Sequence, residues 1–216
     1  GHKIKLGQIY NSNFYVFSEL VEQSGAEIVM SEVIKDDKDS LQKSFSKALQ
    51  VCDIIISSGG VSMGRFDYVR EVYNELGVQE HFWKVAQKPG KPLFFGTMKS
   101  SLIFGLPGNP ISSLICYVEY IHSTIHGFQK KKKDSKYRAI LTENFAVENK
   151  KHRYLFGQSW IDPSSGKLFC SPTSKLGSHM LTASIESNCI LESPPGKQGL
   201  KAGDKITINL LNWRNF

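Results

Sequence analysis

A glycine- and serine-rich stretch follows one very short apolar run. The stretch SSGGVSMGRFDYV, residues 57–69, comes directly after Ile54–Ile56. Gly59 and Gly64 enclose four residues, which is the spacing of the phosphate loop in ATP-binding proteins. That loop continues with Lys and then Ser or Thr, which reach the phosphates and Mg²⁺, whereas an Arg-Phe pair follows here. We therefore reject an ATP loop and ask which other ligand this loop holds.

Two further loops carry residues that could do chemistry. Asp36 and Asp37 follow an apolar segment that ends near Ile34, and LPGNP, residues 106–110, follows the apolar run 102–104. Glycines let backbone N–H groups point inward and form an anion nest. If the preceding strands are parallel, all three loops gather at one sheet edge, where such sheets bind ligands.

The charged residues near these loops suit a phosphorylated substrate and a divalent cation. Carboxylate oxygens are the ligands that Mg²⁺ prefers, and the candidates are Asp36, Asp37 and Asp67. Positive charge comes from the segment FWKVAQKPGK, which contributes Lys84, Lys88 and Lys91. Each feature also has a simpler explanation. A glycine-rich turn, an acidic loop and a surface lysine are common, Asp67 is placed to cap a helix, and prolines often open one.

The elements that must position these loops alternate between helix and strand. Apolar residues recur at helical spacing in 13–24, which ends before Gly25, and in a second helix that Asp39 or Ser40 would cap. The remaining expected elements are strands at 26–34, 54–56 and 102–104 and helices at 67–76 and from LPGNP to about 126. This alternation predicts an α/β fold: a mostly parallel sheet covered by helices on both faces, in three α/β/α layers.

The second half changes to short alternating runs separated by turns. Residues 154–161 and 167–170 flank the turn DPSSG and indicate a hairpin, and KITINLL, residues 205–211, alternates like a strand. The connector QKKKKDSK separates the halves. We therefore predict an α/β domain over residues 1–133 and a small β-barrel domain over residues 134–216.

Composition limits the class of protein. The 216 residues are 40% hydrophobic and 22% charged, as in ordinary globular proteins, and the net charge of +7 favours an anionic partner. We expect no membrane span, because no run of about 18 apolar residues occurs. The run Lys130–Lys133 lacks interleaved aromatics, so a solvated linker is favoured over nucleic-acid binding. The four cysteines show no CxxC spacing, which indicates reduced thiols in a cytoplasmic protein without zinc or disulfides.

Three long motifs in register resemble one family. SSGGVSMGRFDYV, FWKVAQKPGKPLFFG and GLPGNPISS, together with GQIYNSN, VIKDD, LGSHM and LKAGDKI, resemble the molybdopterin molybdenumtransferases, bacterial MoeA and the gephyrin E domain. The resemblance spans nearly the whole chain. It implies an α/β domain of the molybdopterin-binding type followed by a β-barrel domain. It also implies a cytoplasmic, Mg²⁺-assisted enzyme that inserts molybdenum from molybdate into adenylylated molybdopterin and releases AMP.

The resemblance also implies site residues. Asp36, Asp67, Lys84 and Lys88 would be catalytic, with Asp36 and Asp67 as the metal ligands. The implied substrate-binding residues are Ser58, Gly59, Gly60, Ser62, Gly64, Pro107, Gly108, Asn109, Pro110 and Ser178. Arg65 and Phe66 depart from the smaller or acidic residues that the motif commonly has. The implied partners are molybdopterin-AMP, the molybdopterin adenylyltransferase and, in the full-length protein, a second copy, with no nucleic acid and no membrane.

Two other functions stay open at this point. The family has two preceding domains that this chain lacks, so we expect the fragment alone to be inactive. A molybdopterin adenylyltransferase uses a similar α/β domain, although the appended β-domain and GGVSMGRFD argue against that activity. A non-catalytic pterin-binding scaffold for a partner protein is the remaining alternative, and the intact acidic and lysine positions argue against it.

Overall fold

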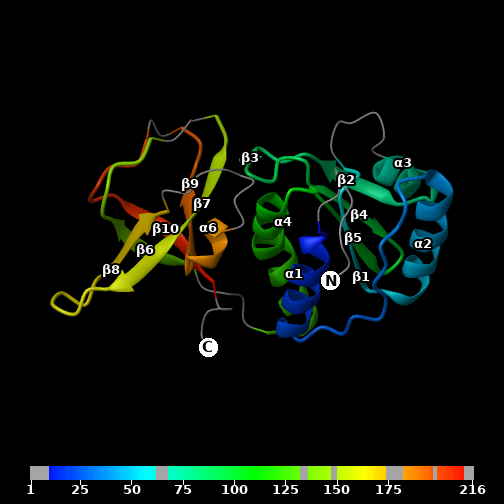
Figure 1. The fold of residues 1–216 in the computed structure, drawn as a ribbon, viewed down its shortest axis with the longest axis horizontal. Coiled ribbons are helices and arrows are strands. Elements are labelled where there is room, and N and C mark those ends of the chain that lie inside the picture. The colour runs from blue at the N-terminus through cyan, green and yellow to red at the C-terminus, as the bar shows by residue number, and fades with distance from the viewer. Residues whose placement is uncertain are drawn as a thin grey trace.

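The computed structural model describes residues 10–61, 68–131, 136–146, 150–173, 182–196 and 199–211. Figure 1 shows an α/β unit, coloured blue to green, beside a β-barrel, coloured mainly yellow to red. These two units confirm the predicted fold class. The predicted boundary between residues 133 and 134 lies outside the described residues, so its position stays a prediction.

The sheet of the α/β unit has four strands in the order β1-β5-β4-β2. They are β1 (Ile54–Ser58), β5 (Ser101–Leu106), β4 (Phe94–Met98) and β2 (Gln79–Trp83). β1 and β5 are parallel, whereas β4 pairs antiparallel with both β5 and β2. The expectation of a mostly parallel sheet is therefore wrong for the described strands. The reason is local: β4 and β5 are joined by the two-residue turn Lys99–Ser100, which only an antiparallel pair permits.

Helices cover both faces of this sheet, which confirms the three layers (Figure 1). One face carries α1 (Ser12–Gln23) and the continuous run of α4 (Pro110–Cys116), the π-helical turn η1 (Tyr117–Ile121) and α5 (His122–Phe128). The other carries α2 (Lys38–Val51) and α3 (Tyr68–Glu75). Successive β5 residues serve opposite faces, since Ile103 packs with α2 and α3 while Phe104 packs with α1 and α4. Among the described residues, no helix is long and apolar enough to cross a membrane.

The expected strand at residues 26–34 is wrong as a strand. These residues form neither helix nor strand in the structure. They still alternate, because Ile28 and Met30 are half-buried while Val29 and Val33 are exposed. A strand requires a hydrogen-bonding neighbour as well as alternation. No described strand pairs with this segment, and β1 stands at the end of its sheet.

The second unit is a closed barrel, as expected. Its strands are β6 (Tyr137–Leu141), β7 (His152–Ile161), β8 (Leu168–Pro172), β9 (Cys189–Ser193) and β10 (Lys205–Leu210), with the short helix α6 (Thr182–Ile185) between β8 and β9. They follow the order β7-β8-β6-β10-β9, and a β7–β9 pairing closes the circle. β7 and β8 form the predicted hairpin. The short strand β3 (Gln87–Lys88), from the α/β part of the chain, pairs parallel with β7.

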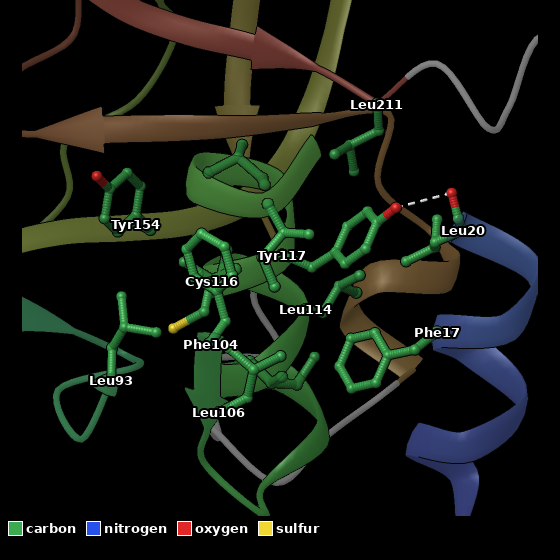
Figure 2. Close-up of a cluster of buried hydrophobic side chains, with 14 of the residues drawn as sticks. Phe17, Leu20, Leu93, Phe104, Leu106, Leu114, Cys116, Tyr117, Tyr154 and Leu211 are labelled. Carbon is green, nitrogen blue, oxygen red and sulfur yellow. Dashed lines mark hydrogen bonds between the residues drawn. The ribbon is translucent and has the colours of Figure 1, made fainter. Parts of the chain in front are cut away.

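The two units share one hydrophobic cluster. Figure 2 shows Phe17, Leu20, Leu114 and Tyr117 of the α/β unit beside Leu211 of the barrel unit. The hydroxyl of Tyr117 donates a hydrogen bond to the carbonyl oxygen of Leu20, 2.8 Å away, and so joins the α4–η1 run to α1. The barrel is therefore packed against the helical face of the sheet rather than tethered only by the connector.

The cysteines are free thiols, as predicted. Cys116, Cys170 and Cys189 are buried, and Cys52 is half-buried. Burial raises the pKa of Cys116 to about 12, that of Cys170 to about 11 and that of Cys189 to about 12. These three thiols stay protonated at neutral pH and serve as small apolar core residues.

Candidate functional site

The parallel register of β1 and β5 brings two of the predicted loops together. Ser58 lies beside Leu106, so both strands end at the same level. The Gly59 N–H donates to the Leu106 carbonyl oxygen at 3.0 Å, and the Ser58 hydroxyl donates to the Pro107 carbonyl oxygen at 3.3 Å. The glycine loop and LPGNP therefore adjoin at the carboxyl edge of the sheet, as the parallel pairing predicts.

Asn13, near the start of α1, ties these two loops to each other. Its side-chain amide nitrogen donates to the Ser58 hydroxyl at 2.7 Å and to the Gly108 carbonyl oxygen at 3.1 Å. The residue is only 8% exposed, although it is polar. Asn13 belongs to the motif GQIYNSN, but no role was predicted for it from the sequence. The available signal was a polar residue on the helix face that the neighbouring apolar residues predict to be buried.

Two glycines of the glycine loop have backbone conformations that favour glycine. Gly59 and Gly60 have φ angles of 91° and 67°, which other residues adopt only at a cost. A Cβ on Gly60 would lie 2.5 Å from the Cγ2 of Val69 in α3. A Cβ on Gly108 would lie 3.6 Å from the Gly59 Cα. The backbones of the two loops are thus in close contact, with their polar groups near one another.

LPGNP is fixed by the first turn of α4. The Asn109 side chain caps this helix by accepting a hydrogen bond from the Ser112 N–H at 3.2 Å, and Pro110 occupies its first turn. The Ser113 hydroxyl bonds the carbonyl oxygens of both Pro107 and Asn109. The simpler structural role expected for Pro110 is therefore present. The same contacts hold the loop in place beside the glycine loop.

The two neighbouring aspartates have different roles. Asp37 caps α2, since its carboxylate accepts hydrogen bonds from the Ser40 N–H at 2.8 Å and the Ser40 hydroxyl at 3.0 Å. These bonds lower the pKa of Asp37, and they replace the caps that we expected at Asp39 or Ser40. Asp36 is exposed and has no hydrogen-bond or ion-pair partner among the described residues. Its carboxylate is therefore available for a ligand.

A cavity of about 470 Å³ connects Asp36 with the glycine loop. Its walls are the inner faces of α1 and α2, the strand β1 and residues 27–36, and Ser58, Gly59 and Gly60 also line it. The third predicted loop thus reaches the same region, through Asp36. Phe17 and Phe45, from the two helix layers, also line it.

The two lysines predicted to be catalytic lie in different surroundings. The Lys84 ammonium lies 3.6 Å from the ring centroid of Trp83, whose indole N–H donates to the Val61 carbonyl oxygen at 2.9 Å. Lys84 is thereby linked to Val61 of the glycine loop. Lys88 is exposed in β3 and is paired with Arg153 of β7, at the junction with the barrel. No role was predicted for Trp83 from the sequence, although it stands in the motif FWKVAQKPGK.

Several predicted residues lie outside the described part of the chain. These are Ser62, Gly64, Arg65, Phe66, Asp67 and Ser178. In the described part, no group of three or more His, Cys, Asp or Glu side chains is suited to hold a metal. Mg²⁺ is often bound by one or two carboxylates together with substrate phosphates. Asp36 lines the same cavity as Ser58, Gly59 and Gly60.

Family models match both units of the chain. The family described as "Probable molybdopterin binding domain" matches residues 1–127, and "MoeA C-terminal region (domain IV)" matches residues 138–211. The chain is 31% identical over 215 residues to a molybdopterin molybdenumtransferase of Haemophilus influenzae, covering 98% of this chain and 53% of that protein. A protein of the same name from Nostoc is 41% identical over 122 residues, which is 55% of this chain and 28% of the relative.

Solved structures show the same fold. A molybdopterin biosynthesis MoeA protein from Pyrococcus horikoshii superposes with a TM-score of 0.76 at 28% identity, covering 97% of this chain and 50% of that one. A second structure from that organism gives a TM-score of 0.74 at 22% identity, covering 95% and 47%. The chain thus spans about half the length of these proteins and of the Haemophilus relative. It belongs to the MoeA family and corresponds to its C-terminal portion.

Proposed function

We propose that this protein acts in molybdenum cofactor biosynthesis as a molybdopterin molybdenumtransferase. In this reaction molybdenum from molybdate enters adenylylated molybdopterin, and AMP is released. The observation that carries the proposal is the meeting of the glycine loop and LPGNP at one sheet edge, with Asp36 on the adjoining cavity. The relatives named molybdopterin molybdenumtransferase support the same assignment.

The residues would have different roles, according to their chemistry. Backbone N–H groups of the glycine loop and the ammonium groups of Lys84 and Lys88 would bind the phosphates of the substrate and offset negative charge that develops in the reaction. Asp36, with Asp67, would hold Mg²⁺, which polarises phosphoryl oxygens. Pro107 to Pro110 and Ser62, Gly64 and Ser178 would shape the pterin-binding region. Asn13 would hold the glycine loop and LPGNP in a fixed position relative to each other.

The proposal extends to partners of the whole protein. We propose that the full-length enzyme is a cytoplasmic homodimer that receives molybdopterin-AMP from the molybdopterin adenylyltransferase. We also propose that this half of the enzyme is inactive by itself, because relatives are about twice as long. Activity is therefore tested on the full-length protein.

The decisive experiment supplies full-length protein with adenylylated molybdopterin, molybdate and Mg²⁺. We expect release of AMP and formation of a cofactor that activates cofactor-free nitrate reductase. Asp36→Asn should lose most of this activity with unchanged melting temperature and unchanged molybdopterin binding. Asp39→Asn, a neighbouring exposed carboxylate in the first turn of α2, is the matched control.

Two results would instead favour the alternatives. Formation of adenylylated molybdopterin from ATP and molybdopterin, without molybdenum insertion, would identify an adenylyltransferase. Absence of molybdopterin binding at millimolar concentration, together with capture of a protein partner, would identify a scaffold. Wild-type insertion rates in a folded Asp36→Asn enzyme would remove Asp36 from the mechanism.

A further inference from the structure

A cluster of charged side chains joins the two units. The Lys136 ammonium, just before β6, donates to the Glu119 carboxylate of η1 at 2.7 Å and to the Glu192 carboxylate of β9. The side chain of Glu119 is only 4% exposed and that of Glu192 only 10%. The side-chain amide of Asn209, in β10, donates a further hydrogen bond to Glu119 at 3.3 Å. The function proposed above gives none of these residues a role.

The π-helical turn η1 also holds the strand β3. The hydroxyl of Tyr120, next to Glu119, donates to the side-chain carbonyl oxygen of Gln87. Gln87 is 2% exposed and pairs in register with His152 of β7. The His152 N–H in turn donates to the Ala86 carbonyl oxygen at 2.9 Å. One turn of the α/β unit therefore contacts the barrel through the charged cluster and also holds the strand that pairs with β7.

Lys136 allows two carboxylates to be buried at this junction. A buried carboxylate that loses its cation is strongly destabilising, unlike an exposed one. Burial acts to lower the pKa of Lys136, but its hydrogen bonds to Glu119 and Glu192 outweigh that effect and raise the pKa, so the ammonium stays charged. The Nε2 atom of His152 lies 3.5 Å from the Oε2 atom of Glu192. Among the described residues, no cation other than Lys136 pairs with Glu119.

We propose that Lys136 is a positioning residue that holds the barrel on the α/β unit and thereby places Lys88. Lys88 lies in β3 and pairs in register with Arg153 of β7, so its place depends on how β7 sits against η1. Loss of the ammonium would leave two like charges at the junction and push β9 away from η1. The role in substrate binding rests on the proposed function, whereas the hold on the barrel does not.

The hold on the barrel is tested without any substrate, by amide hydrogen exchange of the full-length protein. We expect Lys136→Met to speed exchange of the His152 amide about tenfold, because buried carboxylates without their cation favour local opening of the junction. The amides of β5, inside the α/β sheet, should exchange as in wild type. This difference separates opening of the junction from a loss of overall stability. Lys201→Met, at an exposed lysine of the barrel, is the matched control and should change neither rate.

Three further variants separate charge from packing. Lys136→Arg keeps the positive charge and should exchange nearly as wild type. Glu119→Gln keeps the shape of its side chain and should speed exchange only about threefold, because no buried charge is left unpaired. Adding Glu119→Gln to Lys136→Met should slow the exchange seen with Lys136→Met alone. Equal His152 exchange in wild type, Lys136→Met and Glu119→Gln would overturn the proposal, and so would a double variant in which the two single effects simply multiply.

The effect on substrate is tested by molybdopterin binding to the full-length protein. We expect Lys136→Met to weaken binding about fivefold, because Lys88 is no longer held in one place, whereas Lys136→Arg should restore it. Lys201→Met should bind as wild type. Wild-type affinity in Lys136→Met, with its junction amides exchanging faster, would refute the role in substrate binding. If wild type itself binds no molybdopterin, the proposed function fails, while the amide exchange still decides whether Lys136 holds the barrel.

Discussion

Replacing Asn13 tests whether the two loops are held together as the structure shows. Asn13→Ala removes two hydrogen bonds, one to the Ser58 hydroxyl and one to the Gly108 carbonyl oxygen. Each is worth ~0.5 to 1.5 kcal/mol. Ser58 and Gly108 are both exposed, so water can replace the lost donor. The summed loss for the two hydrogen bonds therefore falls in the lower part of its range. We expect a loss of ~1 to 2 kcal/mol in the free energy of unfolding.

Asn13→Asp is the more stringent test, because Asp has the shape of Asn but replaces its hydrogen-bond donor with an acceptor. An ionised carboxylate only accepts hydrogen bonds. It would face the Gly108 carbonyl oxygen at the distance of the present hydrogen bond, 3.1 Å. The Ser58 hydroxyl can rotate to donate to it, but the carbonyl oxygen cannot adapt. We therefore expect ~1 kcal/mol of further destabilisation beyond the alanine variant.

Urea unfolding, followed by tryptophan fluorescence, measures these changes in the free energy of unfolding. Asn74→Asp is the matched control, since Asn74 is exposed in α3, and it should leave the unfolding midpoint unchanged. Molybdopterin binding by the full-length protein should fall in the same order, wild type, alanine, aspartate. An Asn13→Asp protein as stable as wild type, or more stable than Asn13→Ala, would show that the amide does not bridge the loops.

Other perturbations follow from the same region. Gly60→Ala should cost ~2 kcal/mol or more in urea unfolding, through both its φ and the clash with α3, whereas Gly59→Ala meets no atom within 4 Å and should cost ~1 kcal/mol. Asp36→Asn should keep its melting temperature and lose molybdenum insertion. The pKa of Asp37 is lowered by hydrogen bonds from the first turn of α2, so its stabilising effect is present above the ordinary value of 3.8 and is lost as pH falls through the lower folded value. Asp37→Asn should remove that part of the acid dependence in an unfolding series. Lys84→Ala should weaken molybdopterin binding by ~1 to 3 kcal/mol at low salt and less at high salt.

Local patterns predicted the helices well, because the helical signal is contained in the segment itself. The α1 helix has the expected bounds within a residue or so, and Gly25 follows it with a φ of 76°. The glycine loop was recognised because positive φ angles select glycine. The barrel hairpin was recognised because its alternation and its turn are neighbours in sequence.

Strand pairing was predicted poorly because it depends on residues elsewhere. The strand β4 was overlooked, and with it the antiparallel hairpin to β5 that makes the sheet mixed. Residues 26–34 show the alternation of a strand, yet the cavity separates them from the open edge of β1. Alternation states which side chains face inward, whereas pairing requires a partner at hydrogen-bonding distance. The nine residues themselves show which side chains face inward, but they do not show whether a pairing partner is present.

The same distinction explains which parts of the candidate site could not be predicted from the sequence. The motifs name the loops, but their placement depends on side chains outside them. Asn13 is 45 residues from Ser58 and 95 from Gly108 in sequence, and Trp83 is 22 residues from Val61. Asn13 donates hydrogen bonds to both loops and Trp83 donates one to the glycine loop, whose own glycines have no side chains to make contacts. A glycine loop can approach an anion because it lacks side chains, and for the same reason it cannot anchor itself. The elements that flank it must therefore supply the anchors, which is why a polar residue on a buried helix face and a tryptophan at a strand end belong to the site.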